Sequence, residues 1–83
     1  MIPTAALDLL KFDAEDADET AARGDARAGY DLLAAGLRRA EAARDAGFPW
    51  AEELTRRYQE TIERYAERHG LSGSRASELR GDR

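Results

Sequence analysis

The chain has 83 residues, so it has room for one small domain and not for two. It contains no cysteine, which excludes disulfide bridges and thiolate metal sites and fits a reducing compartment. Its net charge of −4 argues against direct binding of nucleic acid, because proteins that bind nucleic acid are normally basic. No apolar run approaches the roughly 20 residues of a membrane span, and the N-terminus lacks the pattern of a secretion signal. We therefore expect no membrane contact and a cytoplasmic, bacterial protein.

Three segments rich in helix-forming residues follow one another along the chain. The sequence predicts helices over about residues 4–23, 26–46 and 49–69. The links between them are short, so neighbouring helices must run antiparallel. The expected fold class is therefore all-α, with an antiparallel helical hairpin and a third amphipathic helix that together form a three-helix bundle over residues 1–70.

Residues with known capping preferences mark the ends of the predicted helices. Thr4, which follows Pro3, is a candidate N-cap of the first helix, and Asp25 is a candidate N-cap of the second. Pro49 suits the first turn of the third helix, and Leu71 can fold back onto its last turn. Each helix is followed by a glycine that can end it: Gly24, Gly47 and Gly70.

The first helical segment carries the net charge of the chain. Up to Ala22 it has six acidic residues against Lys11, a local charge of −5, whereas the rest has 12 arginines against 11 acids. The acids are Asp8, Asp13, Glu15, Asp16, Asp18 and Glu19. They form either a solvated helix face or a docking surface for a basic partner, which includes mimicry of nucleic-acid phosphates. An EF-hand calcium loop is excluded, because the run lacks the required glycine and has a helical pattern.

Apolar side chains of the first helix point in two directions. One strip has alternating spacings of three and four residues and is expected to be buried: Leu7, Leu10, Ala14, Ala17 and Ala21. Leu9 and Phe12 project away from this strip, as does Ile2 if the helix is extended backwards, so we expect them to be wet or partly covered. A neighbouring Leu-Phe pair on an acidic helix is typical of protein contacts. The expected partner-binding residues are Leu9, Phe12, Asp8, Asp16 and Glu19.

The second helix combines an apolar strip with a line of small residues. The strip comprises Tyr30, Leu33, Leu37 and Ala40, and the small residues Gly29, Gly36 and Ala43 recur beside it every seven residues. A glycine inside a helix costs about 1 kcal/mol relative to alanine, so two of them on one line indicate close approach of another helix. We expect the alanines of the first helix to face these glycines, and the large side chains of the third helix to cover the remaining face.

A glycine turn leads into this second helix. Its residues are Arg23, Gly24 and Asp25, followed by small Gly29, apolar Leu33 and small Gly36. This arrangement resembles the second half of a tetratricopeptide-type unit, in which a glycine turn precedes a helix with small residues seven apart. The resemblance covers residues 14–40, and the chain contains no second repeat. It implies a tightly packed helical pair and at most a scaffold for binding peptides or subunits, with no binding site carried over.

The third helix is strongly amphipathic. Its apolar sector comprises Trp50, Leu54, Tyr58, Ile62, Tyr65 and His69, with charged residues on the opposite side. The aromatic stripe is either a ligand-stacking face or the bulk of a small core, and we interpret it as core. His69 is expected to pack or cap in the last turn, with a pH-sensitive contact as its functional alternative.

Residue types that carry chemistry are few. Three serines, Ser72, Ser74 and Ser77, lie in the C-terminal tail, and His69 is the only histidine, so a preorganised nucleophile and base is not expected. Ala66, three residues before His69, does not fit the Glu-x-x-His pairs of di-iron bundles. The chain has no phosphate-binding glycine loop and no dinucleotide fingerprint. We therefore expect no catalytic residue, no cofactor and no metal site.

The C-terminal tail, residues 71–83, has Leu71 and Leu79 as its only large apolar residues. We expect it to be disordered, because it can bury little surface. Two alternatives remain: a short helix from Ser74 that forms against a partner, or a fold-back over Leu9 and Phe12.

Together these patterns predict a small non-enzymatic module for protein–protein interaction or assembly, such as an adaptor. It would dock on another protein or self-associate as a homo-oligomer through its acidic, apolar first helix. The alternative is an acidic inhibitor or antitoxin-like protein that occupies a basic, nucleic-acid-binding surface of its partner. A small enzyme or metal carrier is the third possibility.

Overall fold

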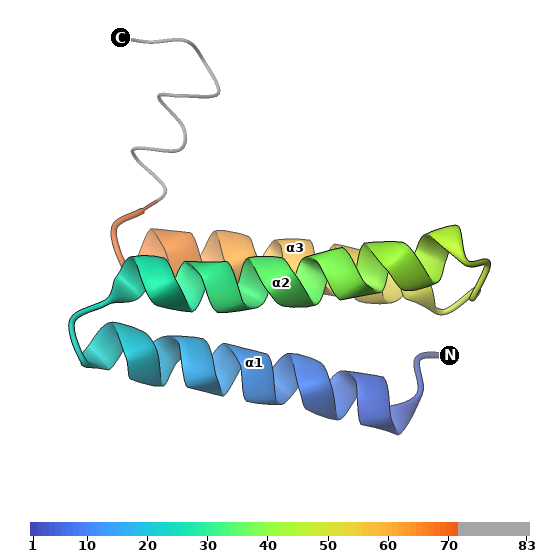
Figure 1. The fold of residues 1–83 in the computed structure, drawn as a ribbon, viewed down its shortest axis with the longest axis horizontal. Helices are drawn as coiled ribbons and strands as arrows, with labels where there is room; N and C mark the ends of the chain where they lie inside the picture. The colour runs from blue at the N-terminus through green and yellow to red at the C-terminus, as the bar shows by residue number, and fades with distance from the viewer. Residues whose placement is uncertain (72–83) are drawn as a thin grey trace, which may run out of the picture.

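The computed structural model describes residues 1–71, in which the chain forms three antiparallel helices (Figure 1). Helix α1 comprises Thr4–Ala22, α2 comprises Ala26–Asp45 and α3 comprises Ala51–Arg68. The predicted all-α three-helix bundle is confirmed, and each boundary lies within two residues of its expected position. Of the expected tail, residues 71–83, only Leu71 is described, and residues 72–83 lie outside the described residues.

The ends of the helices follow the glycine signals. Gly24, Gly47 and Gly70 have φ angles of 99°, 97° and 77°, a left-handed conformation that glycine adopts without steric cost. Asp25 caps α2, since its Oδ1 accepts a hydrogen bond of 3.0 Å from the N–H of Ala28. Leu71 folds back onto α3 as predicted, and its N–H donates to the carbonyl of Ala66 at 2.7 Å.

The start of α1 differs from the prediction. Pro3 occupies the N-cap position, and no side chain caps the helix, so the assignment of Thr4 as N-cap is wrong. The carbonyl of Pro3 already accepts hydrogen bonds from the N–H groups of Ala6 and Leu7 at 3.0 and 3.1 Å. Thr4 is therefore the first helical residue, too late in the chain to act as the cap.

Ile2 is buried, which contradicts the expectation that it faces outward. Pro3 has an extended ψ of 145°, so the chain leaves the helical path there and carries Ile2 back toward the bundle. Only 7% of Ile2 is exposed, and it packs with Leu54, Tyr58 and Ala40. The exposure predicted for a helix extended backwards does not apply, because no helix extends across Pro3.

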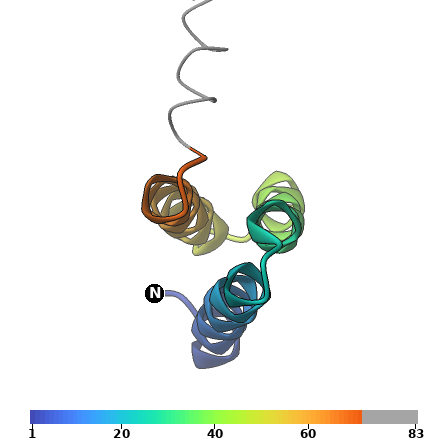
Figure 2. The same cartoon turned by 90° about the vertical axis from the view of Figure 1, so that its left-hand side faces the viewer.

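Helix α2 is the central element of the bundle. It packs against both α1 and α3, whereas α1 and α3 make few contacts with each other (Figure 2). Figure 1 shows α1 close to α2 at the turn that joins them and diverging from it toward the N-terminus. The arrangement leaves one concave region between α1 and α3 and another where α1 diverges from α2.

The core confirms the predicted apolar sector of α3. It consists of two clusters of buried residues, the first being Ile2, Ala40, Leu54 and Tyr58 and the second Ala17, Leu33, Ile62 and Tyr65. Trp50 and His69, at the two ends of the sector, are half-buried. The aromatic stripe of α3 therefore supplies the bulk of the core.

Gly29 and Gly36 of α2 leave space for different neighbouring groups. A Cβ on Gly29 would overlap the hydroxyl of Tyr65 on α3 and would lie 2.6 Å from the carbonyl oxygen of Ala17, so α1 approaches closely there, as predicted, and α3 does so as well. A Cβ on Gly36 would instead lie 2.7 Å from the carboxylate of Asp13 and would overlap the ring of Tyr58. Gly36 therefore makes room for side chains from α1 and α3, and not for an alanine of α1.

Candidate protein-docking surface

The acidic residues of α1 fall into an inward and an outward group. Asp13 belongs to the inward group: its Oδ2 accepts hydrogen bonds from the Tyr58 hydroxyl at 2.7 Å and from Arg39 Nη2 at 3.0 Å. Burial and the hydrogen bond to Asp13 raise the pKa of Tyr58 well above its ordinary value, so the phenol remains a neutral donor. This carboxylate joins α1 to both other helices.

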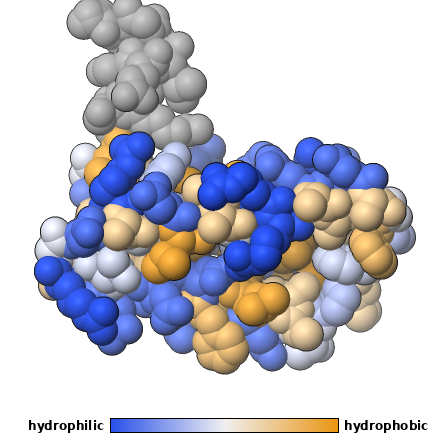
Figure 3. Space-filling model, in the orientation of Figure 1, coloured by the Kyte–Doolittle hydropathy of each residue, from blue (hydrophilic) through white to orange (hydrophobic). Residues whose placement is uncertain are grey.

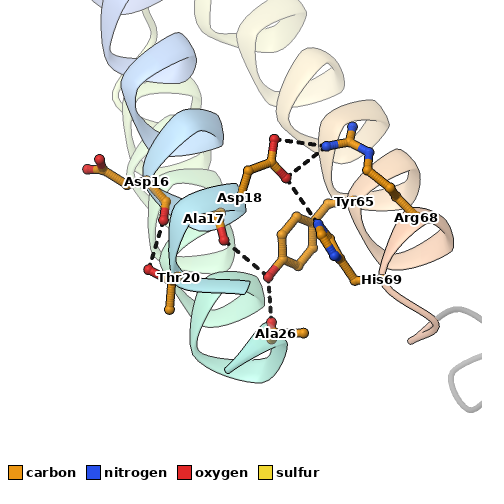
Figure 4. A network of polar contacts seen from close by, with 8 residues as sticks. All are labelled: Asp16, Ala17, Asp18, Thr20, Ala26, Tyr65, Arg68 and His69. Carbon is orange, nitrogen blue, oxygen red and sulfur yellow. Dashed lines mark hydrogen bonds and ion pairs between the residues drawn. The ribbon is translucent and has the colours of Figure 1, made fainter. Parts of the chain in front are cut away.

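Asp18 is the second inward acid, and it joins α1 to the end of α3 (Figure 4). Its two oxygens lie 2.7 and 2.8 Å from Arg68 Nη1, and Oδ1 lies 3.1 Å from His69 Nε2. Burial acts to raise the pKa of Asp18, but the hydrogen bonds from His69 and Arg68 outweigh it and hold the pKa below its ordinary value. His69 stacks on Tyr65 with ring centroids 4.4 Å apart, which agrees with the predicted packing role.

Tyr65 completes this network at the turn between α1 and α2. Its hydroxyl donates to the carbonyl of Ala26 at 2.6 Å and lies 3.4 Å from the carbonyl of Ala17. Burial, followed by the negative charges of Asp18 and Asp25, raises the pKa of Tyr65. Both inward acids therefore hold α1 against the other helices.

The outward acids are Asp8, Glu15, Asp16 and Glu19, and all four are exposed. Figure 4 shows the carboxylate of Asp16 pointing away from that of Asp18. Glu19 forms an ion pair of 3.2 Å with Arg23, but both side chains are well exposed, and such pairs contribute little. The outward acids thus form a negative surface on the side of α1 away from the bundle.

Leu9 and Phe12 lie on the same side of α1, as predicted, and they are 52% and 56% exposed. Asp8 and Asp16 are one helical turn before and after Phe12, so carboxylates flank the apolar pair along the helix. The face shown in Figure 3 has hydrophobic side chains on α1 next to hydrophilic ones. We call the exposed surface formed by Leu9, Phe12, Asp8, Glu15, Asp16 and Glu19 the acidic-apolar face. The structure brings together all five residues predicted to bind a partner.

An apolar hollow of about 160 Å³ adjoins Leu9 where α1 diverges from α2. Its apolar lining comprises Ala6, Leu9, Ala40, Ala43, Trp50 and Leu54. Trp50 is half-buried, and its ring lies 5.3 Å from that of Phe48. Sequence reasoning missed this hollow, because it depends on the angle between two helices, for which the chain carries no local signal.

Comparison of the chain with protein-family models, with curated proteins and with solved structures gives no match. Over residues 1–71, no helix is both long and apolar enough to cross a membrane. Within the same part of the chain, no three histidine, aspartate or glutamate side chains are grouped so that they could hold a metal ion. The expected cytoplasmic location and the expected lack of enzymatic activity stay predictions.

Proposed function

We propose that this protein is a non-enzymatic docking module whose acidic-apolar face binds a protein surface that is both basic and apolar. One observation carries the proposal: Leu9 and Phe12 are about half exposed beside an apolar hollow and are flanked by exposed carboxylates. The other side of the same helix provides the contacts that the fold requires. The face can therefore bind a partner without disturbing the bundle.

Apolar contact and charge have different parts in this proposal. Full burial of a leucine or phenylalanine side chain contributes about 1.5–3 kcal/mol, so covering the exposed half of each adds about 1 kcal/mol per residue. The carboxylates add speed and selectivity of association, because they attract basic surfaces and repel acidic ones. The hollow offers a place for one apolar side chain of the partner.

The alternative function, an acidic inhibitor that imitates nucleic-acid phosphates, would depend on charge alone. Two of the six acids of α1, Asp13 and Asp18, are engaged in internal hydrogen bonds, and Leu9 and Phe12 interrupt the remaining acidic surface. These observations favour docking with apolar contact. The two functions also differ in salt dependence, since binding by charge alone weakens steeply between about 50 and 200 mM salt.

The test uses a short amphipathic helical peptide made of leucine and lysine, titrated into the protein by calorimetry. The variant Leu9→Asp/Phe12→Asp makes the face more acidic while it removes the apolar pair. We expect at least a tenfold loss of affinity, because apolar contact is lost although the charge attraction has increased. Leu32→Asp, which alters an exposed leucine of α2 outside both the acidic-apolar face and the hollow, is the control and should bind like the wild type.

The opposite result in this titration would support the alternative function, an acidic inhibitor. If Leu9→Asp/Phe12→Asp binds the peptide as well as the wild type or more tightly, charge alone drives binding, and the docking proposal is wrong. Repeating the titration at higher salt provides a second criterion. Binding that disappears in the wild type at moderate salt would favour the acidic inhibitor.

A further inference from the structure

A groove of about 280 Å³ runs between α1 and α3, on the side of α1 that faces the bundle. Its floor is apolar and consists of Leu7, Leu10, Ala14, Leu33 and Tyr65. The groove exists because α1 and α3 both pack against α2 and make few contacts with each other (Figure 2). Ligand pockets usually enclose about 300–1,000 Å³, so this open groove suits a helix surface better than an enclosed small molecule.

Cationic side chains border this groove on both sides. Lys11 lies on α1, and Arg64 and Arg68 lie on α3. Arg68 is paired with Asp18, whereas neither Lys11 nor Arg64 has an acidic partner within 4 Å among residues 1–71. Three cations and one carboxylate give the groove a formal charge of +2. It therefore has the chemistry that the acidic-apolar face requires of a partner.

We propose that the occupant of this groove is the acidic-apolar face of a second copy of this chain. The inference rests on the proposed function, because it names the partner of that same face. In the complex, Leu9 and Phe12 of one copy cover the apolar floor of the next copy. The exposed carboxylates around Phe12 then lie near Lys11 and Arg64 of that copy.

Charge argues against the other occupants that the chain suggests. The side chains of residues 72–83 have three arginines and two acids, a formal charge of +1, so the tail does not supply the negative charge that would complement the groove. A basic partner would be repelled from the groove. The acidic-apolar face has the opposite sign and a matching apolar pair, which makes it the best complement among the surfaces described.

The two surfaces lie on different sides of α1, so the contact joins unlike patches of the two copies. Such a heterologous contact does not close on itself in a dimer, since each added copy leaves one face and one groove free. We therefore expect association that continues to larger assemblies as the concentration rises. A symmetric dimer formed through one shared patch is not expected.

The test uses two full-length variants, each with one surface blocked. The groove variant is Lys11→Glu/Arg64→Glu, and the face variant is Leu9→Asp/Phe12→Asp. All four side chains are exposed, and thermal unfolding followed by circular dichroism verifies that both variants are folded. Each variant alone should self-associate at least about tenfold more weakly than the wild type in light scattering.

The decisive sample is an equimolar mixture of the two variants. The groove variant retains a working face and the face variant retains a working groove, so the mixture should form a complex of two chains. Its mass should be twice the 9.2 kDa of one chain and should not increase further with concentration. The control Arg27→Glu/Arg38→Glu changes the net charge equally on the exposed side of α2 and should associate like the wild type.

Two results would overturn the inference: a wild type that stays monomeric at millimolar concentration, or a mixture that forms no two-chain complex. A groove variant that still dimerises alone would also overturn it, because a shared patch would then explain the contact. The leucine-lysine peptide separates the two proposals. If the wild type stays monomeric but binds the peptide through Leu9 and Phe12, self-docking is wrong and the proposed function stands.

Discussion

The hydroxyl of Tyr58 donates a hydrogen bond of 2.7 Å to the carboxylate of Asp13, which lies 45 residues earlier in the chain. Arg39 donates to the same oxygen at 3.0 Å, so one carboxylate joins side chains from all three helices. The space above Gly36 is where Asp13 and Tyr58 meet, and a side chain there would displace both. Asp13, which the sequence groups with the other acids of the first helix, thus joins all three helices.

Replacing Asp13 by alanine should lower the free energy of unfolding by about 1–3 kcal/mol, because the partly buried hydroxyl of Tyr58 loses its acceptor. Urea denaturation followed by circular dichroism measures the change. The matched control is Asp16→Ala, which removes an exposed acid from the same helix and should change stability by less than about 0.5 kcal/mol. Equal effects of the two substitutions would contradict the structural role of Asp13.

Gly36→Ala should destabilise the protein by about 1–3 kcal/mol, although alanine is the better helix former. The added Cβ would overlap the ring of Tyr58 and lie 2.7 Å from the carboxylate of Asp13, so both side chains must move. Thermal unfolding provides the measurement. A second variant, Gly36→Ala/Tyr58→Leu, should lose less stability than the sum of the two single substitutions, since the shorter side chain relieves the overlap. A more stable Gly36→Ala variant would disprove the close contact.

Ile2→Ala should cost about 2 kcal/mol of stability, at the low end of the usual range for a buried isoleucine, because a terminal segment can adjust. The loss reports the contact of Ile2 with Leu54 and Tyr58. Leu32→Ala is the control, since Leu32 is 41% exposed and should lose less than half as much. Urea denaturation of both variants measures the two losses of stability. A negligible effect at Ile2 would mean that the N-terminal segment contributes nothing to the core.

The contribution of Asp18 to stability should depend on pH in the acidic range. Its pKa in the folded chain lies below the ordinary value of 3.8, so its pairing stabilises the fold above that value and is lost as pH falls through the folded pKa. The contribution is a few tenths of a kcal/mol, since both Asp18 and Arg68 are partly exposed.

The matched comparison for this effect is wild type against Asp18→Asn in urea denaturation between pH 5 and pH 2. The stability difference should be constant near pH 5 and should shrink below about pH 4. Other carboxylates are present in both proteins, so their titration cancels. A difference that grows as the pH falls would have the wrong sign for a lowered pKa.

The helices, their glycine ends and the exposure of Leu9 and Phe12 could be predicted from the chain alone. These features depend on local periodicity and on the backbone preferences of single residues, which the sequence displays directly. The cap at Asp25 and the buried stripe of α3 could be predicted for the same reason. In each case the relevant neighbours are within one or two helical turns.

Only the tertiary structure decided which acids of α1 face inward, because Asp13 and Asp18 find their partners 45 and 50 residues away. It also placed Ile2 in the core, and it put Lys11 and Arg64 on opposite sides of one groove. These outcomes depend on the angles at which helices cross. A pattern along one helix defines a polar side and an apolar side, but which neighbour covers each side is set by how all three helices pack together.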